Sequence, residues 1–354
     1  MTSLLQSLSD AEVVVCCGPG GVGKTTMSAA LAVAQARLGR RVCVLTVDPA
    51  RRLADALGVA NVGSDITRVP GIEGGSLDAL MLDTARTFDD LIGRYAESEE
   101  QADAIRANRL YRSLATALSG TQEYMAMEKL YELTCSGDYD LVVVDTPPTR
   151  NALDLLDAPR RLTSFLENRI FRALLVPTRA YLRAVSFATR TLLSTIGSVA
   201  GAELVSDAVT FFQAFAGMEE GFAVRAGAVH DRLRAATTAF VLVTSPRPDA
   251  ITEARFFADR LVDVGLSPAG VIVNRVHPRF GPESLPEGLA DAEGSLGALV
   301  ANLVRLNAEA AAEHEALRDL TEAVSPAPVA AVPLTANAIH DLAGLVTLGE
   351  QLAR

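Results

Sequence analysis

The sequence predicts an α/β fold, a doubly wound and mostly parallel sheet with an inserted α-helical subdomain. Short apolar segments rich in β-branched residues alternate with segments of helical periodicity. A glycine-rich turn joins the first apolar segment to the first helical one. Two long intervals carry helical periodicity with no strand between their helices. The first two observations indicate helices on both faces of a parallel sheet, and the third indicates the insertion.

Continuous apolar runs suit strands that are buried on both faces, as in a parallel sheet covered by helices. The predicted strands are 12–17, 41–47, 140–145, 239–244, 270–274 and 328–334. Helices are predicted at 24–38, at 252–264, where Phe256, Phe257 and Leu261 recur on one face, and at 294–324.

The intervals from about 87 to 133 and from about 155 to 233 carry the helical periodicity without strands, for example at Leu162, Phe165 and Ile170. We therefore expect an α/β domain built from 1–86, 134–154 and 236–354. The helical subdomain is expected to comprise 87–133 and 155–235.

Composition excludes several classes of protein. The chain has 354 residues, a net charge of −11, 49% hydrophobic and 21% charged residues, which indicates a globular protein and argues against disorder. No block of Lys and Arg is present, so nucleic acid is not expected as a ligand. The N-terminal segment lacks the pattern of a signal peptide, and no apolar run suits a membrane span. We expect a cytoplasmic protein without direct membrane insertion, whose four cysteines are buried core thiols.

The stretch "CCGPGGVGKTT" contains Gly18, four further residues, and then Gly23-Lys24-Thr25, which satisfies the Walker A pattern. It follows a predicted strand and opens a predicted helix, as a P-loop NTPase requires. Glycines let the backbone approach a phosphate, and successive N–H groups and the helix N-terminus attract anions. Lys24 is expected to meet the β- and γ-phosphates, and the Thr25 hydroxyl to hold Mg²⁺. The predicted ATP-binding residues of the loop are Gly20, Gly21, Val22, Gly23, Lys24, Thr25 and Thr26.

Two aspartates end predicted strands, where ligands of open α/β sheets bind. Asp145 in "LVVVDTPPT" is the candidate Walker B carboxylate that holds Mg²⁺, either directly or through water. Asp48 in "TVDPARRLADALG" is the candidate for orienting the attacking water, so Asp48 and Lys24 are the candidate catalytic residues. For both aspartates, capping of the following helix is the alternative interpretation.

These segments together resemble the family of arsenical pump-driving ATPases and of the ATPase that delivers tail-anchored membrane proteins. The resemblance rests on "GPGGVGKTTMSAALAVAQARLGRRVCVLTVDPARRLADALG" and "DYDLVVVDTPPTRNALDLLDAP". It extends to "LSGTQEYMAMEKLYEL", "FVLVTSPRPDAITEARFFADRL", "VIVNRVHP" and "VPL", and so covers most of the chain.

The resemblance implies an ATPase that uses ATP and Mg²⁺ and sandwiches the nucleotide near a dimer face. It assigns Asp48 to switch I and the hydrolytic water, and Asp145 to the start of switch II. It places Asn274 against adenine, with Pro333 and Leu334 in the adenine-side loop. In that family the helical insertion carries the partner surface. The resemblance therefore implies that the helical subdomain of 87–133 and 155–235 is the candidate surface for a client or partner.

The chain departs from the family at Pro19, where members usually carry a second lysine that reaches phosphates bound by the other subunit. Proline supplies no charge and removes one backbone N–H. Because a cation supplied in trans accelerates phosphoryl transfer, we expect slow hydrolysis unless another residue or a partner compensates. The candidates are Arg51, Arg52 and Arg150, or a paralogous subunit that brings the lysine; a homodimer and a heterodimer both remain open.

Two further departures concern ligands. The segment "PTRNA" stands where the family has a histidine, and no thiolates cluster in the sequence, so arsenite is not an expected effector. The C-x-x-C that holds zinc in some homologues is absent after Asn274, and His277 there is expected to be structural or solvated.

The leading hypothesis is a cytosolic dimeric ATPase that couples its nucleotide state to binding of a hydrophobic client helix or a membrane-protein partner. One alternative is an ATPase subunit of an anion efflux system. Another is a partitioning or division-site ATPase acting on DNA or membrane, although the C-terminal segment lacks the basic residues that such a protein needs. A metal-insertion enzyme is disfavoured by the lack of His/Cys clusters, and GTP by the lack of a guanine motif.

Overall fold

The computed structural model describes residues 3–48, 52–109, 111, 121–147, 157–158, 164, 210–211, 214–215, 217–281, 289, 293–336 and 338–353. The chain divides into two compact units. The first comprises Met1–Met81, Leu133–Leu153 and Ala236–Arg354, and the second Leu82–Glu132 and Asp154–Ala235. The first boundary lies at Met81, whereas the sequence analysis places it after residue 86.

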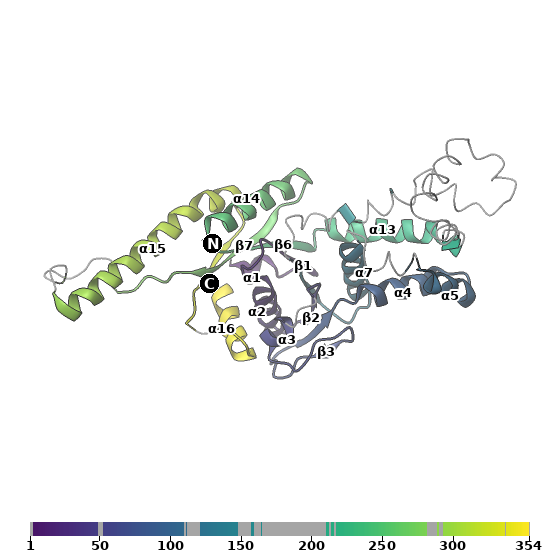
Figure 1. Cartoon of the computed structure of the whole chain (residues 1–354), viewed down its shortest axis with the longest axis horizontal. Helices are drawn as coiled ribbons and strands as arrows, with labels where there is room; N and C mark the ends of the chain where they lie inside the picture. Colours follow the sequence, from purple (N-terminus) through teal and green to yellow (C-terminus); the bar gives the residue numbers. More distant parts are fainter. Residues whose placement is uncertain are drawn as a thin grey trace. The chain divides into compact units, whose positions relative to one another are not determined.

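The first unit is built around an eight-stranded sheet (Figure 1). Its spatial order is β3 (Thr67–Arg68), β4 (Ser76–Met81), β2 (Arg41–Thr46), β5 (Leu141–Asp145), β1 (Val13–Cys17), β6 (Thr238–Thr244), β7 (Pro268–Val276) and β8 (Val329–Pro333). Each neighbouring pair is parallel except β3 and β4. The α/β class with a mostly parallel sheet is thus confirmed.

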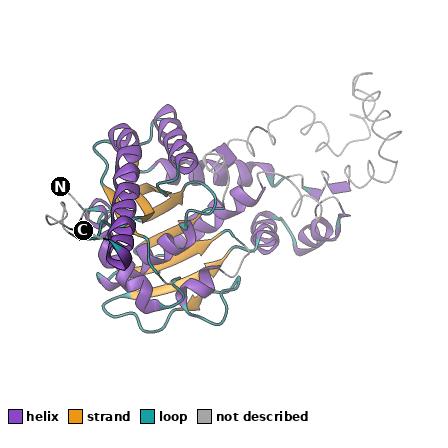
Figure 2. Cartoon of the chain, turned by 60° about the vertical axis from the view of Figure 1, so that its left-hand side comes forward, coloured by secondary structure: helices purple, strands orange, loops and turns teal. Residues whose placement is uncertain are grey.

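Helices cover both faces of this sheet (Figure 2). They are α1 (Leu4–Ser7), α2 (Lys24–Arg37), α3 (Arg52–Leu57), α14 (Pro248–Asp263), α15 (Gly294–Val324) and α16 (Leu342–Leu352). The connection from β1 through α2 to β2 runs in one direction across the sheet, and that from β6 through α14 to β7 runs in the other. Because such crossovers are right-handed, the two helices lie on opposite faces.

The reversal of direction creates a switch point between β1 and β6, and ligands of open α/β sheets bind beside the carboxyl ends of strands at such a point. The core is built by alternation along the strands. Val14 and Cys16 of β1 face the side on which α2, α3 and α16 pack, together with Val143 of β5 and Val243 of β6.

The sequence analysis missed two strands, β3 and β4. Asp78 lies in the middle of β4 and interrupts its apolar run, yet its side chain is only 6% exposed. Tyr139 donates a hydrogen bond to Asp78 Oδ2 at 3.0 Å, and Arg68 Nε lies 2.7 Å from Oδ1. These partners compensate the buried charge, so a strand forms where the sequence pattern does not indicate one. The helix predicted at 252–264 begins earlier, at Pro248, which suits the first turn of a helix.

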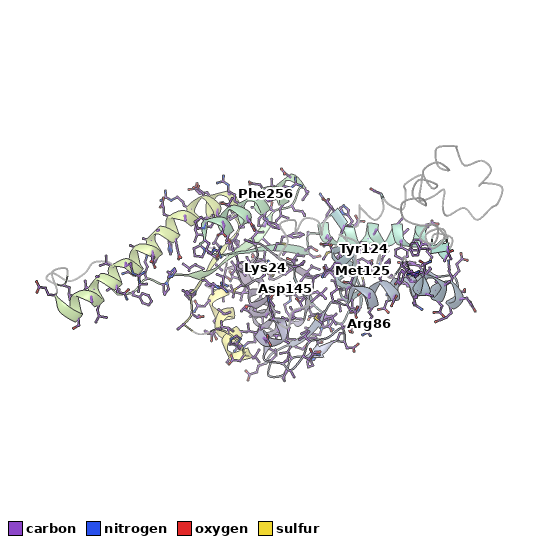
Figure 3. All side chains as sticks on the ribbon, in the orientation of Figure 1. Lys24, Arg86, Tyr124, Met125, Asp145 and Phe256 are labelled. Atoms are coloured by element: carbon purple, nitrogen blue, oxygen red, sulfur yellow. The ribbon has the colours of Figure 1, made fainter. Side chains whose placement is uncertain are left out.

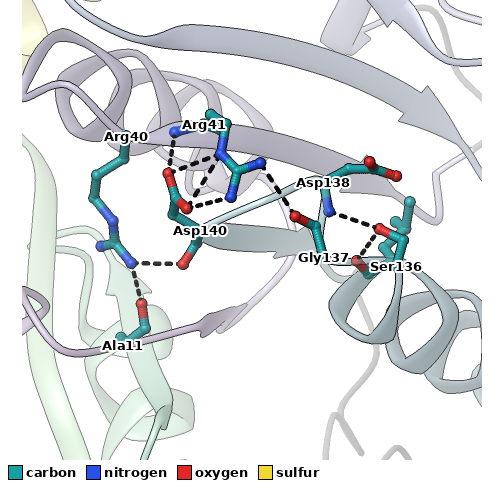
Figure 4. Close-up of polar contacts among 8 residues, drawn as sticks. Ala11, Arg40, Arg41, Ser136, Gly137, Asp138 and Asp140 are labelled. Carbon is teal, nitrogen blue, oxygen red and sulfur yellow. Dashed lines mark hydrogen bonds and ion pairs between the residues drawn. The ribbon is translucent and has the colours of Figure 1, made fainter.

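Polar contacts also join the amino ends of the central strands (Figure 4). Asp140 precedes β5 and accepts hydrogen bonds from the backbone N–H and the guanidinium of Arg41, which begins β2. Arg40 donates to the carbonyls of Leu8 and Ala11 and to the carbonyl of Asp140. These two arginines tie β2, β5 and the segment before β1 together at the edge of the sheet away from the glycine-rich loop.

The described part of the second unit is helical. It contains α4 (Thr84–Tyr95), α5 (Glu99–Ala107), most of α7 (Thr121–Cys135) and α13 (Glu219–Arg234). An aromatic cluster that includes Tyr111, Phe211, Phe215 and Phe222 forms its core. The predicted apolar positions Leu162, Phe165 and Ile170 lie outside the described residues.

A buried ion pair also joins helices of this unit. Glu128 on α7 is 1% exposed and accepts hydrogen bonds from Arg225 Nε on α13 at 2.7 and 3.0 Å. The Arg225 guanidinium lies over the ring of Tyr131, 4.0 Å from its centroid. The pair fixes α7 against α13, because either charge left alone in this environment carries a large desolvation cost.

Candidate functional site

The glycine-rich loop follows β1 directly and leads into α2, so it lies at the switch point of the sheet. Gly18 begins it with a φ of 146°, and a Cβ at this position would lie 2.0 Å from the Val243 carbonyl oxygen. Only glycine lets the chain pass this close to the backbone of β6. Gly23, with a φ of 92°, is the N-cap of α2.

Lys24, labelled in Figure 3, begins α2, and its side chain reaches back to the loop. Its Nζ donates hydrogen bonds to the carbonyls of Gly18 and Pro19, both at 2.8 Å. Burial lowers the pKa of Lys24, while Asp145 opposes this shift. An ammonium has three donors, so one remains for a phosphate oxygen beyond the two carbonyls. A partly desolvated cation beside a glycine-rich loop and a helix N-terminus is suited to an anion.

Asp145 ends β5 and is fully buried, with 0% exposure. Its Oδ2 accepts a hydrogen bond from Thr46 at 2.9 Å, whereas Oδ1 has no hydrogen-bond partner among the described residues. Burial raises the pKa of this carboxyl, and its interactions with Thr25, Thr46 and Lys24 oppose the rise. An unpaired carboxylate oxygen beside the Thr25 hydroxyl provides the hard oxygen ligands that Mg²⁺ prefers, so the residues fit this metal.

Asp48 follows β2 closely and forms an ion pair with Arg52 on α3, with 3.5 Å between Oδ2 and Nη1. The Asp48 side chain is 17% exposed, and its negative charge opposes the lowering of the Lys24 pKa by burial. Thr46 connects the two acidic segments, because its hydroxyl donates to Asp145 and accepts from the Asp48 backbone N–H at 3.2 Å. Sequence reasoning did not select Thr46, although a polar residue ending a buried strand is a signal for it.

Asn274 lies near the end of β7 and is 8% exposed. Its Nδ2 donates to the carbonyl of Val22 at 2.8 Å, so the amide holds the phosphate loop. A Cβ on Gly23 would lie 2.5 Å from the same Nδ2, so close packing against Asn274 also requires the last glycine of the loop. The resemblance predicts a contact of Asn274 with adenine; the Asn274 Oδ1 leaves an acceptor for a base, and the contact stays a prediction.

A cavity of 420 Å³ lies beside the outer turn of the loop. Loop residues Pro19 to Val22 line one side, and Ser245, Arg275 and Leu334 are among the others. Leu334 follows β8 and donates its N–H to the Val276 carbonyl at 2.8 Å, and Pro333 ends β8. This places the predicted adenine-side segment at the rim of the cavity. His277 also lines it and is held by Glu313 of α15, with 2.6 Å between Nδ1 and Oε1.

Several expectations meet the structure in different ways. Arg51 and Arg150, two candidates for replacing the missing lysine, lie outside the described residues, and Arg52 pairs with Asp48. Pro19 itself is buried.

Three cysteines are buried as expected, and burial raises the pKa of Cys16 to about 12, but Cys135 is exposed, because it ends α7 at the surface. In the described ranges no three His, Cys, Asp or Glu side chains gather as metal ligands, and no helix has the length and apolarity to cross a bilayer.

Comparison with known proteins points to one family. The profile described as anion-transporting ATPase matches residues 11–354. The chain is similar to an uncharacterised protein of Streptomyces coelicolor, at 32% identity over 266 residues, which are 75% of this chain and 62% of the relative. It is also similar to the ATPase GET3 of Malassezia globosa, at 33% identity over 153 residues, which are 43% of this chain and 44% of the relative. A protein of Mycobacterium tuberculosis is 35% identical over 170 residues, 45% of this chain and 40% of the relative.

The matched segments thus span less than two thirds of the length of these relatives.

Proposed function

Because the chain belongs to the anion-transporting ATPase family, we propose that it binds ATP together with Mg²⁺ and hydrolyses it at the loop after β1. The observation that carries this proposal is the burial of Lys24 and Asp145 together at the switch point of the sheet. A lysine and a carboxylate with an unpaired oxygen there are matched to a nucleotide phosphate and its metal ion.

Different residues of the site have different roles in this proposal. Backbone N–H groups of Gly20 to Thr26 and the Lys24 ammonium bind and orient the phosphates. The Thr25 hydroxyl and the Asp145 carboxylate hold Mg²⁺, which neutralises phosphate charge when bound. Asp48 orients the attacking water, and the hydrogen bonds of Thr46 to Asp145 and to the Asp48 backbone connect the metal-binding and water-orienting segments.

Hydrolysis by the purified chain tests this proposal directly. Release of phosphate from Mg·ATP should be measurable and should be lost in Lys24→Ala and in Asp48→Asn. The Lys24 variant should also lose nucleotide binding, whereas the Asp48 variant should keep it, because Asp48 acts on water rather than on the nucleotide. Turnover by both variants at the wild-type rate would show that the activity belongs to a contaminant or to another site.

The site is proposed to work in a dimer, as a homodimer or with a lysine-bearing paralogue, that couples its nucleotide state to a hydrophobic client helix or a membrane-protein partner. The support is the resemblance to tail-anchored-protein-targeting ATPases and the presence of a second, helical unit with its own core. The test is retention of an apolar transmembrane segment in solution by the purified chain with ATP, with ADP and without nucleotide. Equal precipitation of the segment in all three states would remove the client role.

The family description itself favours a second candidate, the ATPase subunit of an anion efflux system. Such a subunit responds to its anion or to its membrane partner, so hydrolysis measured with added oxyanions separates the two candidates. Stimulation by an oxyanion without any effect of an apolar helix would favour efflux. The slow turnover that we expect without a partner follows from Pro19, which supplies no charge.

A further inference from the structure

Arg275 has a backbone conformation that needs a reason. Its φ is 64°, and it is the one residue other than glycine with a positive φ in the part of the chain that the structure describes. A side chain in the left-handed region costs free energy, and such residues persist where surrounding structure enforces them, often at functional sites. The register explains how the strain arises.

The strain belongs to a β-bulge in β7. Asn274 pairs with Val332 of β8, and Val276 pairs with Pro333, so Arg275 is the extra residue on the bulged strand. Bulges re-aim side chains beside active sites. In β7 the bulge lets two successive residues address the phosphate loop, whereas a regular strand would point them to opposite faces of the sheet.

The two side chains hold two successive loop carbonyls. Asn274 Nδ2 donates to Val22 O at 2.8 Å, and Arg275 Nη1 donates to Gly21 O at 3.3 Å. In a trans peptide the C=O and the following N–H point in opposite directions. Fixing these two carbonyls on the β7 side therefore turns the N–H groups of Val22 and Gly23 to the opposite side.

Arg275 also places a positive charge near Pro19, a residue that supplies none. Pro19 is buried, and both Pro19 and Arg275 line the 420 Å³ cavity. Lys24 is held by two loop carbonyls, and two other arginines near the loop are engaged by carboxylates: Arg52 pairs with Asp48, and Arg247 Nε donates to Asp249 at 3.1 Å. Arg275 is exposed and forms no ion pair with a carboxylate of the described residues. A guanidinium carries five donors, so the bond to Gly21 leaves donors and the full charge for an anion.

We propose that Arg275 is the positioning residue and cation of the phosphate loop, which holds the Gly21 carbonyl and binds the polyphosphate of a nucleotide in the charge-deficient turn at Pro19. The inference rests on the proposed function, because it assigns a ligand contact to the same site. It locates the compensating charge within the same chain and on β7, rather than in the segments after Asp48 or Asp145.

The test uses Mg·ATP binding by the purified full chain, measured by titration calorimetry, in wild type, Arg275→Gly, Arg275→Gln and Arg275→Lys. Glycine relieves the left-handed strain and removes the charge, so Arg275→Gly should keep or raise the melting temperature while the Kd for Mg·ATP rises about tenfold to a hundredfold, as expected for loss of a charged hydrogen bond. Arg275→Gln should lose affinity to a similar extent, and Arg275→Lys should recover part of it. The salt dependence of binding should become shallower in the Gly and Gln variants.

A matched control is Arg279→Gly, since Arg279 is exposed on the segment after β7 and does not line the cavity. This variant should bind Mg·ATP as the wild type does. Wild-type affinity in Arg275→Gly would overturn the proposal, because a purely structural bulge needs no charge. If the wild-type chain binds no Mg·ATP, or if Lys24→Ala binds it equally well, the proposed function fails and this inference fails with it. If the wild-type chain binds Mg·ATP and Arg275→Gly binds it with the same affinity, only this inference is overturned.

Discussion

At the residue scale, the site contains residues whose surroundings leave no room for a larger side chain or leave a buried charge incompletely paired. Gly18 passes the β6 backbone with no room for a side chain, and Asp145 is a carboxylate held in the core with one oxygen unpaired. Lys24 is a buried cation whose partners are loop carbonyls. Each of these local costs is understandable if a phosphate and a metal ion are the missing partners, because they complete the charges and hydrogen bonds.

Gly18→Ala should destabilise the first unit by about 3 kcal/mol or more, because the new methyl group would overlap the Val243 carbonyl and force β6 away from β1. The free energy of unfolding from urea titration measures this effect. Gly39→Ala is the matched control: Gly39 also has a positive φ of 96°, but a Cβ there has no neighbour within 4 Å. It should cost about 1 kcal/mol, the strain alone. Equal losses in both variants would argue against the close approach at Gly18.

Asp145→Asn should separate stability from activity. Burial raises the pKa of Asp145, so the ionised carboxyl destabilises the folded chain progressively as the pH rises above the unfolded value of 3.8. The neutral amide removes that cost and should raise the free energy of unfolding at neutral pH by about 1 kcal/mol without nucleotide. Hydrolysis should fall about a hundredfold or more, because a metal ligand is lost.

The comparison is made by urea unfolding at pH 7 and at pH 3.5 and by phosphate release. The stability gain should be larger at pH 7 than at pH 3.5. A variant that is less stable than the wild type at both pH values would mean that the carboxylate is held by stronger local partners than Thr25, Thr46 and Lys24.

At the scale of elements, the two ends of the sheet serve different tasks. At the carboxyl ends, β1 leads into the glycine-rich loop, and residues at the ends of β2, β5 and β7 interact with that loop or with Lys24. At the amino ends, Arg40 and Arg41 join β2 and β5 to the segment before β1 (Figure 4). We propose that the first set of contacts serves a ligand, whereas the second set secures strand pairing.

The Arg41–Asp140 contact should give a small acid-dependent stabilisation. Hydrogen bonds from Arg41 lower the pKa of Asp140 from 3.8 to about 2. A carboxyl with a depressed pKa stabilises the fold fully above 3.8, and this contribution is lost as the pH falls towards 2. Because the Asp140 side chain is 42% exposed, screening by solvent limits the contribution to about 1 kcal/mol or less.

Urea unfolding of the wild type and Asp140→Asn at pH 6 and pH 3, at one ionic strength, measures this contribution. The stability difference should shrink at pH 3. A difference that is the same at both pH values would assign it to the backbone contact of Asp140 rather than to its charge.

At the scale of the whole molecule, the proposed activity requires more than one chain. Since Pro19 brings no cation to a partner, closure of a homodimer depends on the nucleotide and on protein contacts. Specific hydrolysis activity of the purified chain should therefore rise with protein concentration, and sedimentation should show association that is promoted by Mg·ATP and absent in Lys24→Ala.

A constant specific activity over a hundredfold range of protein concentration, with a monomer throughout, would contradict the dimeric switch. Binding of ATP without turnover at every concentration would instead point to the heterodimer, in which a paralogue brings the lysine.

Periodicity and turn chemistry in the sequence were sufficient to predict six of the sheet strands, the three covering helices α2, α14 and α15, and the loop that joins β1 to α2, but not the covering helices α1, α3 and α16. These features are local: an apolar run of one length suits a buried strand, and Gly, Lys and Thr at fixed spacing suit a phosphate turn. The same reasoning placed Asp48 and Asp145 after the ends of parallel strands and Lys24 at the start of the helix that follows β1, and topology alone brings these positions to one edge of the sheet.

Only the tertiary structure decided which further residues reach that edge. Thr46 bridges Asp145 to the Asp48 backbone, and Arg275 reaches Gly21 from a strand more than two hundred residues later in the chain. β4 forms around a buried Asp78 because Tyr139 and Arg68 compensate it across space. The physical reason is common to these cases. Neighbouring strands supply the partners of buried polar groups and set the register that creates a bulge. No local pattern in the sequence records which strands become neighbours.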